Sequence, residues 1–208
     1  MQNMYEPYYG NDLGAVYTAE KTTFRLWAPT AEMVKICLFH AGNGEEAFEI
    51  SDMKAAENGT WYFEKEGDLD KVYYTYLVTV DGVTRETNDP YAKAAGVNGK
   101  RSMVIDFSKT NPEGFLEDKG PVVEKETDII VYEVSIIDTT ADESCNAKYP
   151  GKYLGMTEEG LVSKEGFATG LDHMKELGVT HIQIMPSYDF GSIDESRLDI
   201  PQYNWGYD

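Results

Sequence analysis

Tyr203, Trp205 and Tyr207 bring three aromatic rings into the stretch YNWGYD, together with Asn204 and Asp208. This combination is typical of a carbohydrate site, because the apolar face of a sugar ring stacks on an aromatic ring while amides and carboxylates bind its hydroxyls. The alternative is that the aromatic residues are incidental to an exposed chain terminus. The choice between the two depends on the elements that would position the stretch.

The composition is that of a globular protein with a strongly acidic surface. The 208 residues are 41% hydrophobic and 12% aromatic, which is enough for one large domain or two ordinary ones. The 37 acidic residues outnumber the 18 basic ones and give a net charge of -19. Such a surface disfavours nucleic acid and anionic membranes as partners but does not affect a neutral ligand such as a glucan.

Targeting, redox and metal signals are weak. The opening residues MQNMYEPYYGNDLG carry no basic or apolar signal region, and the chain has no apolar run of transmembrane length, so we expect a cytoplasmic protein. Cys37 and Cys145 are expected in different domains and therefore as free thiols. His40, His173 and His181 lack metal-ligand spacing, so we expect neither a metal site nor a cofactor.

Residues 15–106 show a period of two, which is typical of half-buried strands. Phe24 and Leu26 alternate with polar neighbours, and the strand-like stretches TWYFEKE, VYYTYLVTV, VTRET and RSMVIDF follow. Asp81 and Gly82 stand between two of these stretches, where an Asp-Gly pair favours a type I′ hairpin. Short strands at this spacing predict a β-sandwich.

The pattern changes beyond residue 106. The charged, Gly- and Pro-containing stretch SKTNPEGFLEDKGPVVEKET predicts a linker. DIIVYEVSII then predicts a strand buried on both faces of a parallel sheet, and VTHIQIMP predicts a second strand. Between them, one face of a helix is marked by Phe167, Leu171, Met174 and Leu177. Gly178 is expected to end this helix in the left-handed conformation, which completes a right-handed βαβ unit.

Such a unit is incomplete by itself. Two parallel strands and one helix leave strand edges and one sheet face uncovered, with unpaired backbone groups and exposed apolar surface. Long loops follow both strands, at the carboxyl ends where α/β enzymes place their sites. The stretch YNWGYD lies in the second of these loops.

Several motifs together carry a family resemblance. GAVYTAEKTTFRLWAPTA, DPYAKAAGVNGKRSMVIDF, GKYLGMTEEG, GLDHMKELGVTHIQIMP and above all YNWGYD resemble type I pullulanases, the α-1,6-glucan debranching members of glycoside hydrolase family 13, the α-amylase family. The resemblance implies that residues 8–115 form an immunoglobulin-like β-sandwich, a family-48 carbohydrate-binding module. It implies a linker at 116–127 and, at 128–208, the first βαβ unit of an incomplete TIM (β/α)8 barrel.

The resemblance also implies a function. The chain would be the amino-terminal fragment of a pullulanase-like hydrolase that acts on α-1,6 branches of α-glucans such as glycogen, starch or pullulan. Tyr203, Asn204, Trp205, Tyr207 and Asp208 would line the substrate cleft, with Tyr207 stacking under the sugar whose bond is broken. In this family the catalytic acids come from barrel strands 4, 5 and 7, so no catalytic residue is expected here and the chain alone should be inactive. The alternative is a stand-alone, non-catalytic protein that binds an α-glucan or another partner. Neither reading indicates an oligomeric state.

Three positions of the first barrel strand depart from the family. Where pullulanases have His, Arg and Phe, this chain has Ser135, Ile137 and Thr139. Exchanging Arg for Ile removes a buried charge and a fork of hydrogen-bond donors, so the parent enzyme is expected to be altered or inactive.

The sandwich departs from its relatives as well. Glycogen-binding relatives have Lys and Trp where Leu77 and Thr84 are the nearest residues here. Trp27 and Trp61 are expected in the core rather than as sugar platforms.

Overall fold

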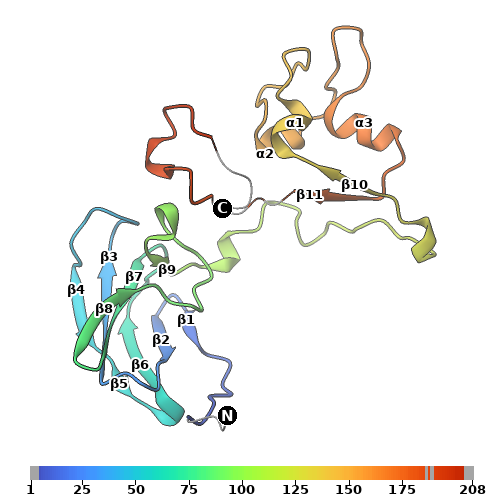
Figure 1. Ribbon diagram of the computed structural model, residues 1–208. Helices are drawn as coiled ribbons and strands as arrows, with labels where there is room; N and C mark the ends of the chain where they lie inside the picture. The colour runs from blue at the N-terminus through green and yellow to red at the C-terminus, as the bar shows by residue number, and fades with distance from the viewer. Residues whose placement is uncertain (1–4, 186, 188–189, 204–208) are drawn as a thin grey trace. The chain divides into compact units, whose positions relative to one another are not determined.

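The structure, a computed structural model, describes residues 5–185, 187 and 190–203. The chain divides into two compact units (Figure 1). The first unit ends at Phe115 but also includes the described segment 190–203, and the second unit starts at Leu116.

Two antiparallel sheets make up most of the first unit. Sheet 1 contains, in this order, β1 (Gly14–Tyr17), β2 (Lys21–Trp27), β6 (Thr60–Glu66) and β5 (Lys54–Ala55). Sheet 2 contains, in this order, β4 (Glu49–Asp52), β3 (Met33–Phe39), β7 (Tyr73–Val80) and β8 (Val83–Thr87), with β9 (Ser102–Met103) also paired to β7. Short turns of 3-10 helix lie at η1 (Glu57–Gly59), η2 (Val97–Gly99), η3 (Phe107–Lys109) and η5 (Glu195–Arg197).

The inner faces of the two sheets form one hydrophobic core. Its buried residues are Phe24, Leu26, Val34, Ile36, Leu38, Met53, Leu69, Tyr74, Tyr76 and Val104. The rings of Phe24 in sheet 1 and Tyr74 in sheet 2 meet edge to face, with centroids 5.0 Å apart. The predicted β-sandwich is therefore confirmed, and its core follows the period of two along β2, β3 and β7.

The hairpin between β7 and β8 has the predicted geometry. Asp81 and Gly82 both have positive φ, 50° and 71°, as a type I′ turn requires. The strand predicted for RSMVIDF is shorter than expected and covers only Ser102 and Met103. The chain turns after it because Asp106 caps η3 by accepting a hydrogen bond from Ser108 N–H.

The second unit contains the predicted strand, helix and strand. β10 (Val131–Val134) and β11 (His181–Ile184) pair in parallel, as the βαβ pattern predicts. Three short helices lie between them: α1 (Ile136–Thr140), α2 (Tyr153–Met156) and α3 (Gly170–Glu176). Gly178 has a φ of 73° just after α3, which confirms the predicted left-handed end of that helix. A turn of 3-10 helix, η4 (Glu126–Asp128), precedes β10.

Two expectations for the first of these strands are wrong. DIIVYEVSII is predicted as one long strand, but β10 has four residues and Ser135 is already the N-cap of helix α1. The strand was also expected to be buried on both faces, yet Ile130 and Val131 are 51% and 54% exposed. Among the described residues only β11 pairs with β10, and in the strand Tyr132 is 42% exposed whereas Val134 is buried.

Cys37 and Cys145 are free thiols, as predicted. Within the described ranges, no helix has the length and apolar character needed to cross a bilayer.

Candidate carbohydrate-binding site

The predicted sugar-binding stretch is only partly visible. Tyr203 is 86% exposed, so its ring is free to meet a ligand. Asn204, Trp205, Tyr207 and Asp208 lie outside the described residues. Their assignment to a sugar site therefore remains a prediction.

In the segment that leads to Tyr203, the side chain of Gln202 hydrogen-bonds back to the backbone of Asp194 and Arg197. The side-chain amide of Gln202 donates to the carbonyls of Asp194 and Arg197 at 2.9 and 3.0 Å, and its Oε1 accepts from Asp194 N–H at 2.7 Å. The carboxylate of Asp194 accepts from Ser196 N–H at 3.0 Å and from its hydroxyl, which lowers the pKa of Asp194. These contacts give the chain a defined course up to the residue before Tyr203.

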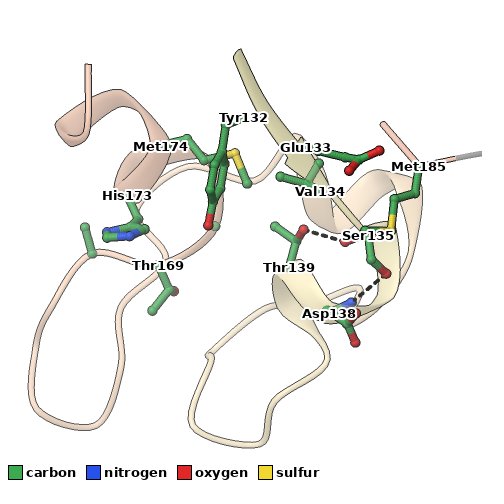
Figure 2. A pocket seen from close by; sticks show the side chains of 12 residues that line it. Tyr132, Glu133, Val134, Ser135, Asp138, Thr139, Thr169, His173, Met174 and Met185 are labelled. Atoms are coloured by element: carbon green, nitrogen blue, oxygen red, sulfur yellow. Dashed lines mark hydrogen bonds between the residues drawn. The ribbon is translucent and has the colours of Figure 1, made fainter. Parts of the chain in front are cut away.

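An open hollow of about 510 Å³ lies in the second unit between β10 and the helices (Figure 2). It is lined by Tyr132, Glu133, Val134, Ser135, Asp138, Thr139, Ala168, Thr169, Gly170, His173, Met174 and Met185. Figure 2 shows His173 on α3 at one side and Glu133, Ser135 and Asp138 on β10 and α1 at the other. The hollow thus brings together acidic, hydroxyl and imidazole groups.

The hydroxyls in this hollow have structural roles. Ser135 is the N-cap of α1, and its Oγ accepts from Asp138 N–H at 3.4 Å. The Thr139 hydroxyl donates to the Ser135 carbonyl at 2.6 Å (Figure 2). Two of the three departures from the family pattern, Ser135 and Thr139, therefore stabilise the short helix α1 by hydrogen bonds. The spacing of Ser135 and Asp138 is that of an N-terminal capping motif, and this signal could have predicted the helix.

The same hollow does not contain the hydrogen-bonded groups of a catalytic site. The Glu133 carboxylate accepts from Gln183 at 3.4 Å. Within the described part of the chain, His173 forms no side-chain hydrogen bond with Glu133, Ser135 or Asp138. A nucleophile activated by a base would need such a bond, so this arrangement does not indicate nucleophilic catalysis. The described residues also contain no group of three or more His, Cys, Asp or Glu residues placed to hold a metal ion.

Ile137, the third departure, is 59% exposed, so the expectation of a buried position is wrong. An arginine at this place would carry donors that Ile137 lacks.

The two described tryptophans of the sandwich differ in their surroundings. Trp61 packs against the core as predicted, and its Nε1 donates to the Ala28 carbonyl at 3.2 Å. The core prediction is wrong for Trp27, which is 37% exposed and donates from Nε1 to the Asn58 carbonyl at 3.0 Å. Trp27 follows Leu26 in β2 and so falls on the outer face of sheet 1.

Leu77 and Thr84, the residues nearest to the Lys and Trp of glycogen-binding relatives, are poorly suited to bind sugar. Leu77 pairs with Glu86 across β7 and β8 and offers only an aliphatic side chain. The Thr84 hydroxyl lies 2.8 Å from that of Thr79, so it is already hydrogen-bonded within the sheet. Neither residue supplies a charge or an aromatic face.

This chain is similar to a carbohydrate-binding module family and to several pullulanases. Residues 12–92 match the family Carbohydrate-binding module 48 (Isoamylase N-terminal domain). The pullulanase of Bacillus subtilis (strain 168) is 34% identical over 97% of this chain and 27% of its own length. Pullulanase 1, chloroplastic, of Arabidopsis thaliana is 33% identical over 91% of the chain and 20% of its own length.

Solved structures agree with the sequence matches. The apo pullulanase of Paenibacillus barengoltzii aligns with a TM-score of 0.90 and 45% identity over 97% of this chain and 31% of its own. The same protein has been solved with maltohexaose and alpha-cyclodextrin. The chain thus spans 27% and 20% of the two relatives named above. Residues 12–92 match carbohydrate-binding module family 48, and the chain as a whole is similar to the amino-terminal region of type I pullulanases.

Proposed function

We propose that this chain serves as the amino-terminal region of a pullulanase-like glycoside hydrolase that cleaves α-1,6 branches of α-glucans. The observation that carries the proposal is the match to the Paenibacillus barengoltzii pullulanase, which spans both units at 45% identity. A match to the binding module alone would leave the second unit unexplained, because the module match ends at residue 92.

In this proposal, residues 8–115 are the carbohydrate-binding module, 116–127 the linker and 128–208 the start of a (β/α)8 barrel. The parallel pair β10 and β11 with α3 between them supports the barrel start, since βαβ is the repeating unit of that fold. The exposed apolar side chains of Val131 and Ile184 also support it, because further strands and helices would cover them.

The proposed substrate contacts are Tyr203, Asn204, Trp205, Tyr207 and Asp208, with an α-glucan as ligand. Aromatic rings would stack on the sugar, and the amide and carboxylate would bind its hydroxyls. Retaining glycosidases also need two carboxyl groups about 5 Å apart, one as nucleophile and one as acid. By family resemblance these groups come from barrel strands that lie beyond residue 208, so we assign no catalytic residue in this chain.

A chimera tests the proposal directly. The chain would replace the matched region of the Paenibacillus barengoltzii pullulanase, and reducing sugar released from pullulan would be measured. We expect hydrolysis by the chimera, a large loss in its Tyr207→Ala variant, and none by the isolated chain. A correctly folded chimera without activity would contradict the proposal. So would turnover by the isolated chain that one carboxylate substitution abolishes.

A stand-alone glucan-binding protein is the second candidate. The match to a carbohydrate-binding module favours it. Maltoheptaose binding by the whole chain and by a chain cut after residue 127 separates the two functions. Micromolar affinity that survives the deletion would favour the binding protein.

A further inference from the structure

The segment 190–203 is hydrogen-bonded to the turn Val97–Gly99 of the sandwich. The contact joins Asn98 to Glu195, 97 residues further along the chain. Asn98 N–H donates to Oε2 of Glu195 at 2.6 Å, and Glu195 N–H donates to Oδ1 of Asn98 at 3.1 Å. The side-chain amide of Asn98 also donates to the Ile193 carbonyl at 2.5 Å. All three hydrogen bonds are partly buried, and we call them the Asn98 clasp.

The turn that carries Asn98 is itself firmly held. A Cβ on Gly96 would lie 2.7 Å from the Cα of Gly42, so two backbone segments pack here without intervening side chains. Arg101 lies 3.5 Å above the ring of Phe39 and donates to two backbone carbonyls at 2.7 Å each. Moving this turn would require repacking of the module, so it provides a rigid anchor.

The clasp requires the particular chemistry of asparagine. Asn98 has a φ of 49°, a left-handed conformation that asparagine tolerates better than most residues. Its amide also supplies the acceptor for Glu195 N–H and the donor for the Ile193 carbonyl at once. Aspartate would lose the donor and place a second carboxylate beside Glu195, and glycine would lose both side-chain bonds.

Hydrogen bonds connect the Asn98 clasp to the residue before Tyr203. Glu195 is the first residue of η5, and Asp194 before it caps the same turn. Asp194 and Gln202 are joined by hydrogen bonds in both directions. The clasp at Asn98 therefore restrains the backbone as far as Gln202, the residue that directly precedes Tyr203.

We propose that Asn98 and Glu195 are positioning residues for the substrate cleft. The module holds segment 190–203 and thereby fixes the position of Tyr203, the first residue of the predicted sugar-binding stretch. The assignment of that stretch to sugar binding rests on the proposed function above. The module thus acts on the cleft as a scaffold, without touching sugar, which suits a sandwich whose Leu77 and Thr84 are poor sugar ligands.

Trypsin cleavage after Arg197 measures the clasp in the chain as it stands. Arg197 lies within the anchored segment, and the peptide 198–208 that cleavage releases contains Trp and Tyr but no Lys or Arg. Its release can be followed by chromatography and mass spectrometry. Cleavage in a folded segment requires local opening, so its rate reports the opening equilibrium.

A matched control is present in the same module. Asn58 has a φ of 52° in the turn Glu57–Gly59, as Asn98 has in Val97–Gly99, but its amide donates to the Pro7 carbonyl at 3.4 Å instead. We expect Asn98→Gly and Glu195→Ala each to speed cleavage about tenfold. The double variant should cleave faster than either single variant, because Asn98→Gly removes the two side-chain bonds of Asn98 and Glu195→Ala removes the remaining bond from Asn98 N–H. Asn58→Gly should cleave at the wild-type rate.

Two results would overturn the clasp. One is wild-type cleavage in Asn98→Gly, and the other is equal acceleration in Asn58→Gly, which would indicate a general loosening of the module. Tryptophan fluorescence during urea unfolding would verify that each variant is folded.

The pullulanase chimera tests the positioning role. Asn98→Gly should raise KM for pullulan about fivefold or more, with a smaller effect on kcat, while Asn58→Gly leaves both unchanged. Faster cleavage with unchanged kinetics would overturn the positioning role. An inactive wild-type chimera would contradict the proposed function and the positioning role together, whereas the clasp would still be judged by the cleavage rates.

Discussion

The hydroxyl of Tyr74 donates a 2.7 Å hydrogen bond to Oδ2 of Asp89 in the core of the sandwich. Tyr76 donates to the same oxygen at 3.3 Å, and Asp89 is only 4% exposed. Burial raises the pKa of Asp89 above its usual 3.8, and the hydrogen bonds from Tyr91 N–H and the two hydroxyls offset only part of this rise. The carboxyl is a buried ionisable group held by two tyrosines.

This site predicts a pH-dependent stability. A raised pKa means that the folded protein binds the proton of Asp89 more tightly than the unfolded chain does. Its contribution to the unfolding free energy is therefore complete below about pH 4 and is lost as the pH rises through the raised value. Asp89→Asn removes this dependence, so the unfolding free energy of the wild type relative to the variant should fall as pH increases. Urea unfolding at several pH values measures it.

Asp81→Asn is the matched control, because Asp81 lies on the exposed hairpin turn. It makes the same change of side chain outside the core, so it separates the effect of burial from the loss of a carboxylate. A difference between Asp89→Asn and the wild type that stays constant with pH would show that the buried carboxyl has no raised pKa.

Much of the fold could be predicted from local pattern. The alternation around Phe24 and Leu26, the turn at Asp81 and Gly82 and the helix end at Gly178 all depend on residues close in sequence. Such signals act through backbone conformation and burial period, which neighbouring residues determine.

The errors arose where two local signals competed. DIIVYEVSII has the apolar run of a strand, but Ser135 offers an N-cap and the chain turns into α1. Trp27 was assigned to the core by residue type, yet the alternation in β2 places it opposite Leu26. For β10 a single capping residue overrode the apolar run, whereas for Trp27 the alternation of the strand overrode the preference of the residue type.

Contacts between distant residues could not be predicted from one sequence. Neither Asn98 nor Glu195 is unusual in its local context, and their hydrogen bonds depend on how the chain folds across 97 residues. Asp89 likewise meets Tyr74 only after β7 is built into sheet 2. Most of the predicted sugar stretch lies outside the described residues, so its geometry stays a prediction.

Trp61 and Trp27 should differ in their effects on stability. Trp61→Ala removes a ring packed against the core, and we expect a loss of about 3 kcal/mol in unfolding free energy. Trp27→Ala removes a ring that is 37% exposed and one hydrogen bond, and we expect a loss of about 1 kcal/mol. Urea unfolding of the two variants makes the comparison. Equal losses would show that Trp27 contributes to the core.

Limited proteolysis should distinguish the two units. The core of the sandwich includes Phe24 and Ile36 at 0% exposure, whereas Val131 and Ile184 in the second unit are 54% and 46% exposed. Fewer buried contacts allow easier local opening. We expect a protease-resistant product that contains the sandwich and ends between residues 106 and 127. Equal resistance of the second unit would show that its exposed strands are covered, for example by self-association, which sedimentation would detect.

The isolated chain should bind α-glucans weakly. Leu77 offers no polar group, and the Thr84 hydroxyl is bonded to Thr79 at 2.8 Å, so neither contributes a strong sugar contact. One stacked aromatic ring contributes about 1 kcal/mol, and a site with so few contacts binds at about millimolar strength or weaker. Titration calorimetry with maltoheptaose should therefore show little or no heat, and Trp61→Ala should lower stability more than affinity. Micromolar binding that Trp27→Ala abolishes would instead identify the outer face of sheet 1 as a sugar site, because Trp27 is the partly exposed indole there.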